Sequence, residues 1–427
     1  MQATPEQKRR SFLFPKPGYT RKVRDPFLFW VAIGTAAWFL WFLVDCRLWM
    51  RFVHRSQKLD HEGKWDELEA LIRRELRAFR PWIRLNIYFK SPGLREAIAA
   101  LCLFQRGKLE ESLRFAEEGA RRSGRKPRTH ADILKLQALA LAGLQRYDEA
   151  REVIGRIRNT GQTAVADHVE SLLCLYLGRL DQALALAESA RREPRTDVAR
   201  HVSSLVHLHQ GSYGPAVEAL LEPPRDVTSL YRADQLAALE RSRDGRSMLD
   251  AHRKTWSGVV EPLRYLLAGY AYLDQENPTE LRFTLEKAAA VMSGNPSIRI
   301  IEAELNACLC AMTGDGAGAD GWLRKGAEIL QTHPRRASAI EYHRYAGRAS
   351  LMLGRKDAAV EALDRSLQLA DHPMERHAGR YWLARAYAAK GDPEKAAELD
   401  RAVASDGIAS RYSKASPPAP SAPPPAS

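Results

Sequence analysis

The sequence predicts an all-α fold in which helical hairpins repeat as a superhelical solenoid after one N-terminal transmembrane helix. Three observations lead to this prediction. Arg, Ala and Leu are abundant, whereas Val, Ile and Thr are sparse after the first 50 residues, which favours helices over strands. An apolar run without charge lies near the N-terminus, and a short turn pattern recurs along most of the remaining chain.

The apolar run covers residues 27–44 and contains 18 residues without a charge. This length is enough to cross a hydrocarbon core of about 30 Å. The run is too long and too rich in Trp and Phe for a cleaved signal peptide, and Asp45 before Cys46 departs from a lipidation site. We therefore expect a transmembrane helix, and the small residues Ala32 and Ala36 would allow a homodimer through this anchor.

The flank at residues 1–26 carries seven Lys or Arg against two acids, and a short basic tail is expected to stay inside. The expected protein is therefore a single-pass protein of a bacterial inner membrane with its repeats in the periplasm. The bacterial origin is inferred from the Arg- and Ala-rich composition alone. Cytoplasmic repeats remain the alternative, because the basic residues close to the span are balanced on its two sides and the cysteines are free.

The turn pattern combines a Gly, an aromatic or Leu shortly after it, and a small residue three positions further on. Steps of 31 to 44 residues separate successive turns, and three consecutive steps are 33, 33 and 34 residues long when the last is counted to Gly245. The clear turns lie at 63–68, 107–112, 145–150, 178–183, 211–216, 244–249, 354–359 and 391–396, with weaker ones near Glu276 and Gly314.

This pattern resembles the tetratricopeptide repeat family, whose unit is a pair of antiparallel helices of about 34 residues. The resemblance covers residues 47–404, about nine or ten hairpins. It implies that small residues lie where two helices cross and that neighbouring hairpins share one core. The best matches are Gly178, Leu180, Ala183, Ala187, Ala190, Gly211, Tyr213, Ala216, Ala384, Tyr387, Gly391 and Ala396.

Three segments depart from the repeat. Residues 79–92 are aromatic and Arg-rich, which suggests either a docking patch or an irregular cap of the first repeat. Residues 223–260 form the weakest unit and could act as a hinge. Residues 405–427 are rich in Pro, Ser and Ala, so we expect a disordered tail, although a Pro-rich tail can also be a ligand.

No catalytic or cofactor motif is present, and the chain is predicted not to be an enzyme. The sequence lacks a phosphate-binding loop, a nucleophile elbow and a zinc-protease helix. The five cysteines are spread without a disulfide or metal spacing, so most are expected to be small buried hydrophobes. The net charge of +13 includes no basic helix face with interleaved aromatics, so nucleic-acid binding is not expected.

The remaining chemistry is the concave groove that the resemblance implies, lined by the first helix of each hairpin. Arg344 and Arg348 share a helix face, and Arg385 and Tyr381 would lie beside them on the next hairpin. Guanidinium groups bind carboxylates through paired hydrogen bonds, so an acidic protein segment is the expected partner. The alternative is that these arginines pair with Glu341 and its neighbours. His168, His201 and Tyr270 complete the predicted groove residues.

The predicted function is therefore a non-enzymatic adaptor that recruits proteins or peptides at a membrane. Two alternatives remain open. One is a structural subunit of an envelope or secretion complex, and the other is a regulatory or sensor subunit that binds a peptide or small ligand in the groove.

Overall fold

The computed structural model describes residues 64–77, 93–123, 127–191, 199–221, 261–292, 294–333 and 335–414, with isolated positions between 48 and 59. All regular elements in these ranges are helices. From Phe52 onward the chain belongs to one structural unit.

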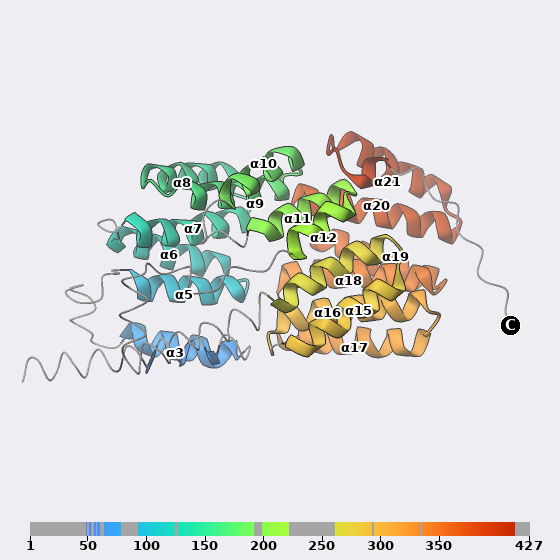
Figure 1. Ribbon diagram of the computed structural model, residues 1–427, viewed down its shortest axis with the longest axis horizontal. Helices are drawn as coiled ribbons and strands as arrows, with labels where there is room; N and C mark the ends of the chain where they lie inside the picture. Colours follow the sequence, from blue (N-terminus) through green and yellow to red (C-terminus); the bar gives the residue numbers. More distant parts are fainter. Residues whose placement is uncertain are drawn as a thin grey trace, which may run out of the picture. The chain divides into compact units, whose positions relative to one another are not determined.

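Antiparallel hairpins follow one another along the chain (Figure 1). In the N-terminal half the helices are α3 (Trp65–Arg77), α5 (Leu94–Gln105), α6 (Leu109–Ser123), α7 (Pro127–Gly143), α8 (Tyr147–Asn159), α9 (Thr163–Tyr176), α10 (Leu180–Ala190), α11 (Ala199–Gln210) and α12 (Tyr213–Leu221). In the C-terminal half residues 261–274 are helical, followed by α15 (Pro278–Val291), α16 (Pro296–Met312), α17 (Gly316–Thr332), α18 (Arg336–Met352), α19 (Lys356–Leu369), α20 (Pro373–Lys390), α21 (Pro393–Ser405) and α22 (Arg411–Lys414).

The hairpin turns share one backbone geometry. In each, an N–H donates to the carbonyl five residues earlier, as in a Schellman motif. Gly178 and Gly354 take the left-handed conformation that this turn requires, with φ of 75° and 71°. The bonds are 2.8–3.0 Å long and join Lys108 to Leu103, Arg146 to Leu141, Arg179 to Cys174, Ser212 to His207, Asn277 to Tyr272, Asp315 to Cys310, Arg355 to Ser350 and Asp392 to Tyr387. The predicted turns in the described residues are thus confirmed, including the two weak ones.

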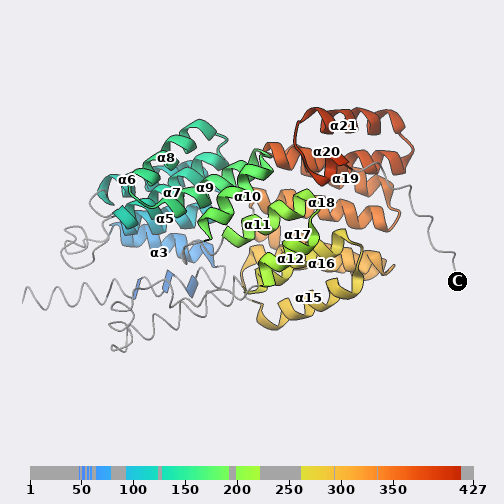
Figure 2. The same cartoon turned by 45° about the horizontal axis from the view of Figure 1, so that its top comes forward.

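Small residues lie where the helices cross. Ala183, Ala187, Ala216 and Ala384 are fully buried, as the repeat pattern predicted. In the C-terminal half, α19, α20 and α21 each lie against the helix that precedes them in the chain (Figure 2). The array therefore buries a continuous apolar core that no hairpin could form alone.

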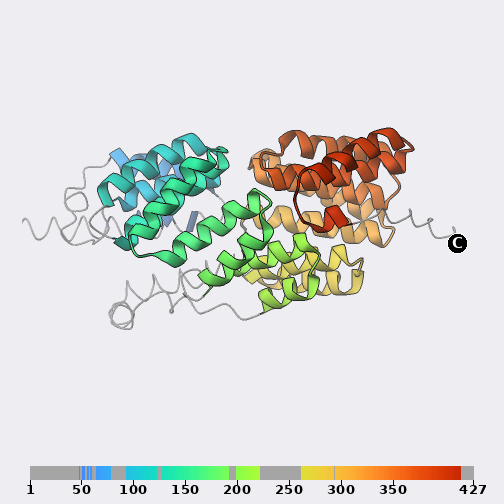
Figure 3. The ribbon, with the colours of Figure 1, turned by 90° about the horizontal axis from the view of Figure 1, so that it is seen from above.

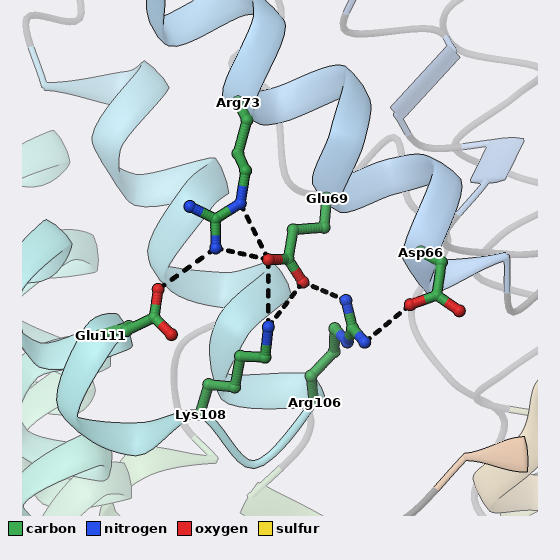
Figure 4. Close-up of polar contacts among 6 residues, drawn as sticks. All are labelled: Asp66, Glu69, Arg73, Arg106, Lys108 and Glu111. Carbon is green, nitrogen blue, oxygen red and sulfur yellow. Dashed lines mark hydrogen bonds and ion pairs between the residues drawn. The ribbon is translucent and has the colours of Figure 1, made fainter.

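An ion-pair network holds α3 against the hairpin of α5 and α6 (Figure 4). Glu69 accepts hydrogen bonds from Arg73 at 2.5 Å, from Lys108 at 3.1 Å and from Arg106. Arg106 also pairs with Asp66 at 2.6 Å. Partial burial acts to raise the pKa of Glu69, but the cations outweigh it and the pKa lies below its ordinary value.

Hairpins far apart in sequence also contact each other. Tyr147 on α8 hydrogen-bonds to Nδ1 of His372 at 2.9 Å. The ring of Tyr176 stacks on His372, with centroids 4.3 Å apart. One buried cluster joins side chains of α9 to α11 with Met374 and Ala378 of α20. The C-terminal hairpins thus share a core with the middle of the array.

The predicted localisation in a bacterial inner membrane is contradicted. Among the helices that the structure describes, none is both long enough and apolar enough to cross a membrane. The predicted flank at 1–26 and the predicted span at 27–44 lie outside the described residues, as do 79–92 and 223–260.

The predicted disorder of residues 405–427 is wrong for the part that the structure describes. After α21 the chain turns back and forms the short helix α22, which contacts α11, α20 and α21 (Figure 3, dark red). Ile408 and Tyr412 are buried, so these residues gain an apolar environment that composition alone did not reveal. Residues 415–427 lie outside the described residues.

Candidate functional site: a cavity among the first helices of the hairpins

A cavity of about 430 Å³ lies among the first helices of several hairpins and the C-terminal segment. Its walls come from α9, α11, residues 267–274, α16, α18, the start of α20 and α22. The volume lies within the range of roughly 300–1,000 Å³ that is typical of ligand pockets. The repeat therefore positions side chains from both halves of the array around one space.

Most of the cavity wall is apolar. The aliphatic side chains come from both halves of the chain, and tyrosines lie among them. These residues are Leu175, Tyr176, Leu205, Leu208, Leu267, Tyr270, Ile300, Ile301, Tyr345, Met374 and Tyr412. Such a wall suits aliphatic or aromatic groups of a ligand, because their transfer from water is favourable.

Asp274 joins two arginines at one side of the cavity. Its carboxylate accepts a hydrogen bond from Arg348 at 2.8 Å and another from Arg411. The Asp274 side chain is only 4% exposed. Burial acts to raise the pKa of Asp274, but the two guanidinium groups outweigh it and hold the pKa below its ordinary value. Two positive charges thus share one negative charge.

The pKa of Glu304 is shifted in the opposite direction from that of Asp274. Its Oε2 accepts a hydrogen bond from the Tyr270 hydroxyl at 2.7 Å. Its Oε1 is buried without a hydrogen-bond partner among the described residues. Burial, and then the nearby charge of Glu341, hold the pKa of Glu304 well above its ordinary value. Both causes favour the neutral form of this carboxyl over the charged form.

The other two acids of the cavity are already engaged. Glu341 pairs with Arg344. Glu375 accepts the backbone N–H groups of Asp371 and His372, both at 3.0 Å, and so caps α20. Burial raises the pKa of Glu341 and of Glu375.

Arg335 is the one lining cation that no carboxylate of the described residues balances. Its Nη1 donates to the Ser297 hydroxyl at 3.3 Å. Burial lowers the pKa of Arg335 from its ordinary value. Arg335 is therefore the point in the cavity where a ligand carboxylate would be favoured.

The three predicted groove arginines each pair with a different acid. Arg344 lines the cavity, but it is buried against Glu341, which is the pairing that the alternative interpretation named. Arg348 is buried, pairs with Asp274 and lies over Trp382 at 4.2 Å. Arg385 bonds to Asp400 at 3.1 Å and lies over the ring of Tyr381 at 4.5 Å.

Of the other predicted groove residues, only Tyr270 lines the cavity. Tyr381 packs on Tyr412, with ring centroids 5.0 Å apart. His168 is buried, and burial lowers its pKa to about 3. Burial likewise lowers the pKa of His201 to about 4. Both imidazoles are therefore neutral near pH 7.

Sequence reasoning missed Asp274, Glu304, Arg335 and Arg411. Asp274 and Arg335 lie at helix ends beside connections, and Glu304 lies within α16. No local signal marked Glu304, because the same helix also carries the charged residues Arg299 and Glu302. For Arg411 the signal was the pair Ile408 and Tyr412, which are apolar at helical spacing.

Among the residues that the structure describes, no group of three or more His, Cys, Asp or Glu converges as metal ligands would. Cys102, Cys174 and Cys308 are buried. Burial raises the pKa of Cys174 to about 11.

No family model matches the sequence, and no curated protein matches it. Solved structures of tetratricopeptide-like helical-repeat proteins are similar to it. A monomeric mutant of IFIT1 with Gppp-AAAA is 14% identical, with 79% of this chain and 73% of that chain covered and a TM-score of 0.37. Yeast Tom70 is 13% identical (82% and 83%, TM-score 0.34), and the APC/C hetero-tetramer Cut9-Hcn1 is 12% identical (82% and 86%, TM-score 0.26).

Proposed function

We propose that this chain is a non-enzymatic protein-binding module, and that its cavity holds a segment of a partner protein that carries an acidic side chain beside aliphatic or aromatic ones. The observation that carries the proposal is Arg335, which pairs with no carboxylate of the described residues and lies beside an apolar wall in a cavity of about 430 Å³. A ligand carboxylate beside Arg335 would accept charge-assisted hydrogen bonds from its guanidinium group. The apolar side chains of the same ligand would be transferred from water to the apolar wall.

The engaged state of the other charges supports this choice of ligand. A basic ligand would need a free carboxylate, whereas Glu341 and Asp274 are paired with arginines and Glu375 caps a helix. Burial and the nearby Glu341 raise the pKa of Glu304, which favours its neutral form over a negative charge that could bind a basic ligand.

The experiment is a fluorescence-anisotropy titration with a panel of labelled peptides in which Asp or Glu lies between Leu, Ile or Phe residues. Matched peptides carry Lys in place of each acid. We expect the acidic peptides to bind the unchanged chain about tenfold or more tightly than the Lys peptides, because one charge-assisted hydrogen bond contributes about 1.5–3 kcal/mol.

The variant Arg335→Glu places a negative charge in the cavity and should abolish the preference for acidic peptides. Arg324→Glu makes the same charge change at an exposed position of α17 and should leave the preference intact. Equal binding of acidic and Lys peptides, or an Arg335→Glu chain that keeps the preference, would contradict the proposal.

A further inference from the structure

The C-terminal segment Gly407–Lys414 packs against the helices that line the cavity. Three of its side chains, Ile408, Arg411 and Tyr412, each occupy a separate contact site, which we call the first, second and third recess. It leaves α21 through Gly407 and ends in the four-residue helix α22. This segment follows α21, so its departure would leave the described hairpins from α5 to α21 covalently intact.

Ile408 fills the first recess. A Cβ at position 178 would lie 2.5 Å from Cδ1 of Ile408, so this side chain packs directly against the bare backbone of the turn at Gly178. Ile408 belongs to the same buried cluster as Leu180 and Met374. An aliphatic side chain is required here because the recess is apolar.

Arg411 fills the second recess, where it bonds to Asp274 and to the Tyr213 hydroxyl at 3.3 Å. Without Arg411, Asp274 would still be paired with Arg348 at 2.8 Å. The recess therefore keeps its buried acid neutralised when it is empty, as a site that exchanges its occupant must.

Tyr412 fills the third recess. Its ring lies among His209 and His377, both at 6.0 Å between centroids, and Tyr381 at 5.0 Å. His377 also contacts two polar side chains at this end of the chain: its Nε2 lies 2.9 Å from the Ser410 hydroxyl and its Nδ1 lies 3.0 Å from Oδ2 of Asp406.

Arg411 and Tyr412 also form part of the cavity wall. From these contacts we infer that the face of the array holds a second recognition site, for a protein segment in which an aliphatic residue is followed three and four positions later by Arg and Tyr. The chain's own C-terminal segment occupies this site, and a partner segment of the same chemistry displaces it and opens one wall of the cavity.

The probe is a fluorescein-labelled peptide with the sequence of residues 405–416, added to full-length chains. In the Arg411→Glu chain a carboxylate faces Asp274, so the chain's own segment should leave and the peptide should bind in its place. We expect this chain to bind the peptide at least about tenfold more tightly than the unchanged chain does. Arg401→Glu, an exposed change on α21, should behave like the unchanged chain.

Two further measurements decide the outcome. The peptide that itself carries Arg411→Glu should not bind the Arg411→Glu chain. In the unchanged chain, an isotope-labelled copy of the peptide in excess should speed amide hydrogen exchange across residues 408–413, which needs no variant to fold. A folded Arg411→Glu chain that binds no better than the unchanged chain, or exchange that the peptide leaves unaltered, would overturn the inference.

Binding at this site does not depend on the acidic ligand proposed for the cavity. Arg335→Glu should leave capture of the 405–416 peptide by the Arg411→Glu chain unchanged. Failure of the cavity proposal and failure of this inference are therefore distinguishable.

Discussion

At the residue scale, Asp274 is the acid that joins two distant parts of the chain. Arg348 lies 74 positions after it and Arg411 lies 137 positions after it. Because all three side chains are at most 15% exposed, water screens their charges little and the ion pairs with Asp274 are strong.

Replacing Asp274 with Asn would leave two buried guanidinium groups without their carboxylate. We expect the free energy of unfolding to fall by about 3–5 kcal/mol, which a urea titration would measure. Asp357→Asn is the matched control, because Asp357 pairs with Lys390 in solvent, and it should cause no measurable change. Equal midpoints for the two variants would contradict the account of Asp274.

Glu304 predicts a dependence of stability on pH. The pKa of Glu304 is higher in the folded chain than in the unfolded one. Its contribution to the free energy of unfolding is therefore fully present below the unfolded pKa of about 4.3 and is lost as pH rises through the folded pKa. The Glu304→Gln chain should therefore lose less stability than the unchanged chain between pH 5 and pH 8.

Urea titrations at these two pH values would test this, with Glu149→Gln as the control. Glu149 is exposed and pairs with Arg146, and hydrogen bonding to Arg146 lowers its pKa. A Glu304→Gln chain with the same pH dependence as the unchanged chain would show that Glu304 is ionised in the folded protein.

At the element scale, the hairpins follow from local rules. Glycine in a left-handed turn, a small residue at each crossing and apolar residues at helical spacing are visible in the sequence, so the turns could be predicted. Even the weak turns near Glu276 and Gly314 carry the same backbone hydrogen bond as the clear ones.

Helical glycines separate the effect of crossing distance from that of helix propensity. A Cβ at Gly347 in α18 would lie 2.4 Å from Cγ of Leu363 on α19, whereas a Cβ at Gly155 in α8 would meet nothing within 4 Å. We expect Gly347→Ala to destabilise the chain by about 1–3 kcal/mol and Gly155→Ala to stabilise it by up to about 1 kcal/mol. Thermal or urea unfolding would measure both, and a stabilised Gly347→Ala chain would contradict the close crossing.

The candidate site could be predicted only in part. The repeat identified the first helix of each hairpin as the lining element, and Tyr270 and Arg344 do line the cavity. The other lining residues could not be predicted, because their positions depend on contacts between distant hairpins. The hydrogen bond between Tyr147 and His372 is one such contact, and no local sequence pattern encodes it. The role of Arg411 was missed because Pro, Ser and Ala dominate the sequence around it.

At the scale of the whole molecule, two halves of the array and the C-terminal segment contribute to one cavity. Its function therefore depends on an arrangement that no single hairpin provides. The central claim is that a partner segment binds in this cavity and contacts helices from both halves.

The most direct test is amide hydrogen exchange of the full-length chain with and without the tightest acidic peptide of the panel. The account predicts slower exchange in α9, α11, α16 and the start of α18, with α6 and α21 unchanged. Protection confined to helices that do not line the cavity, or no protection at saturating peptide, would contradict the account.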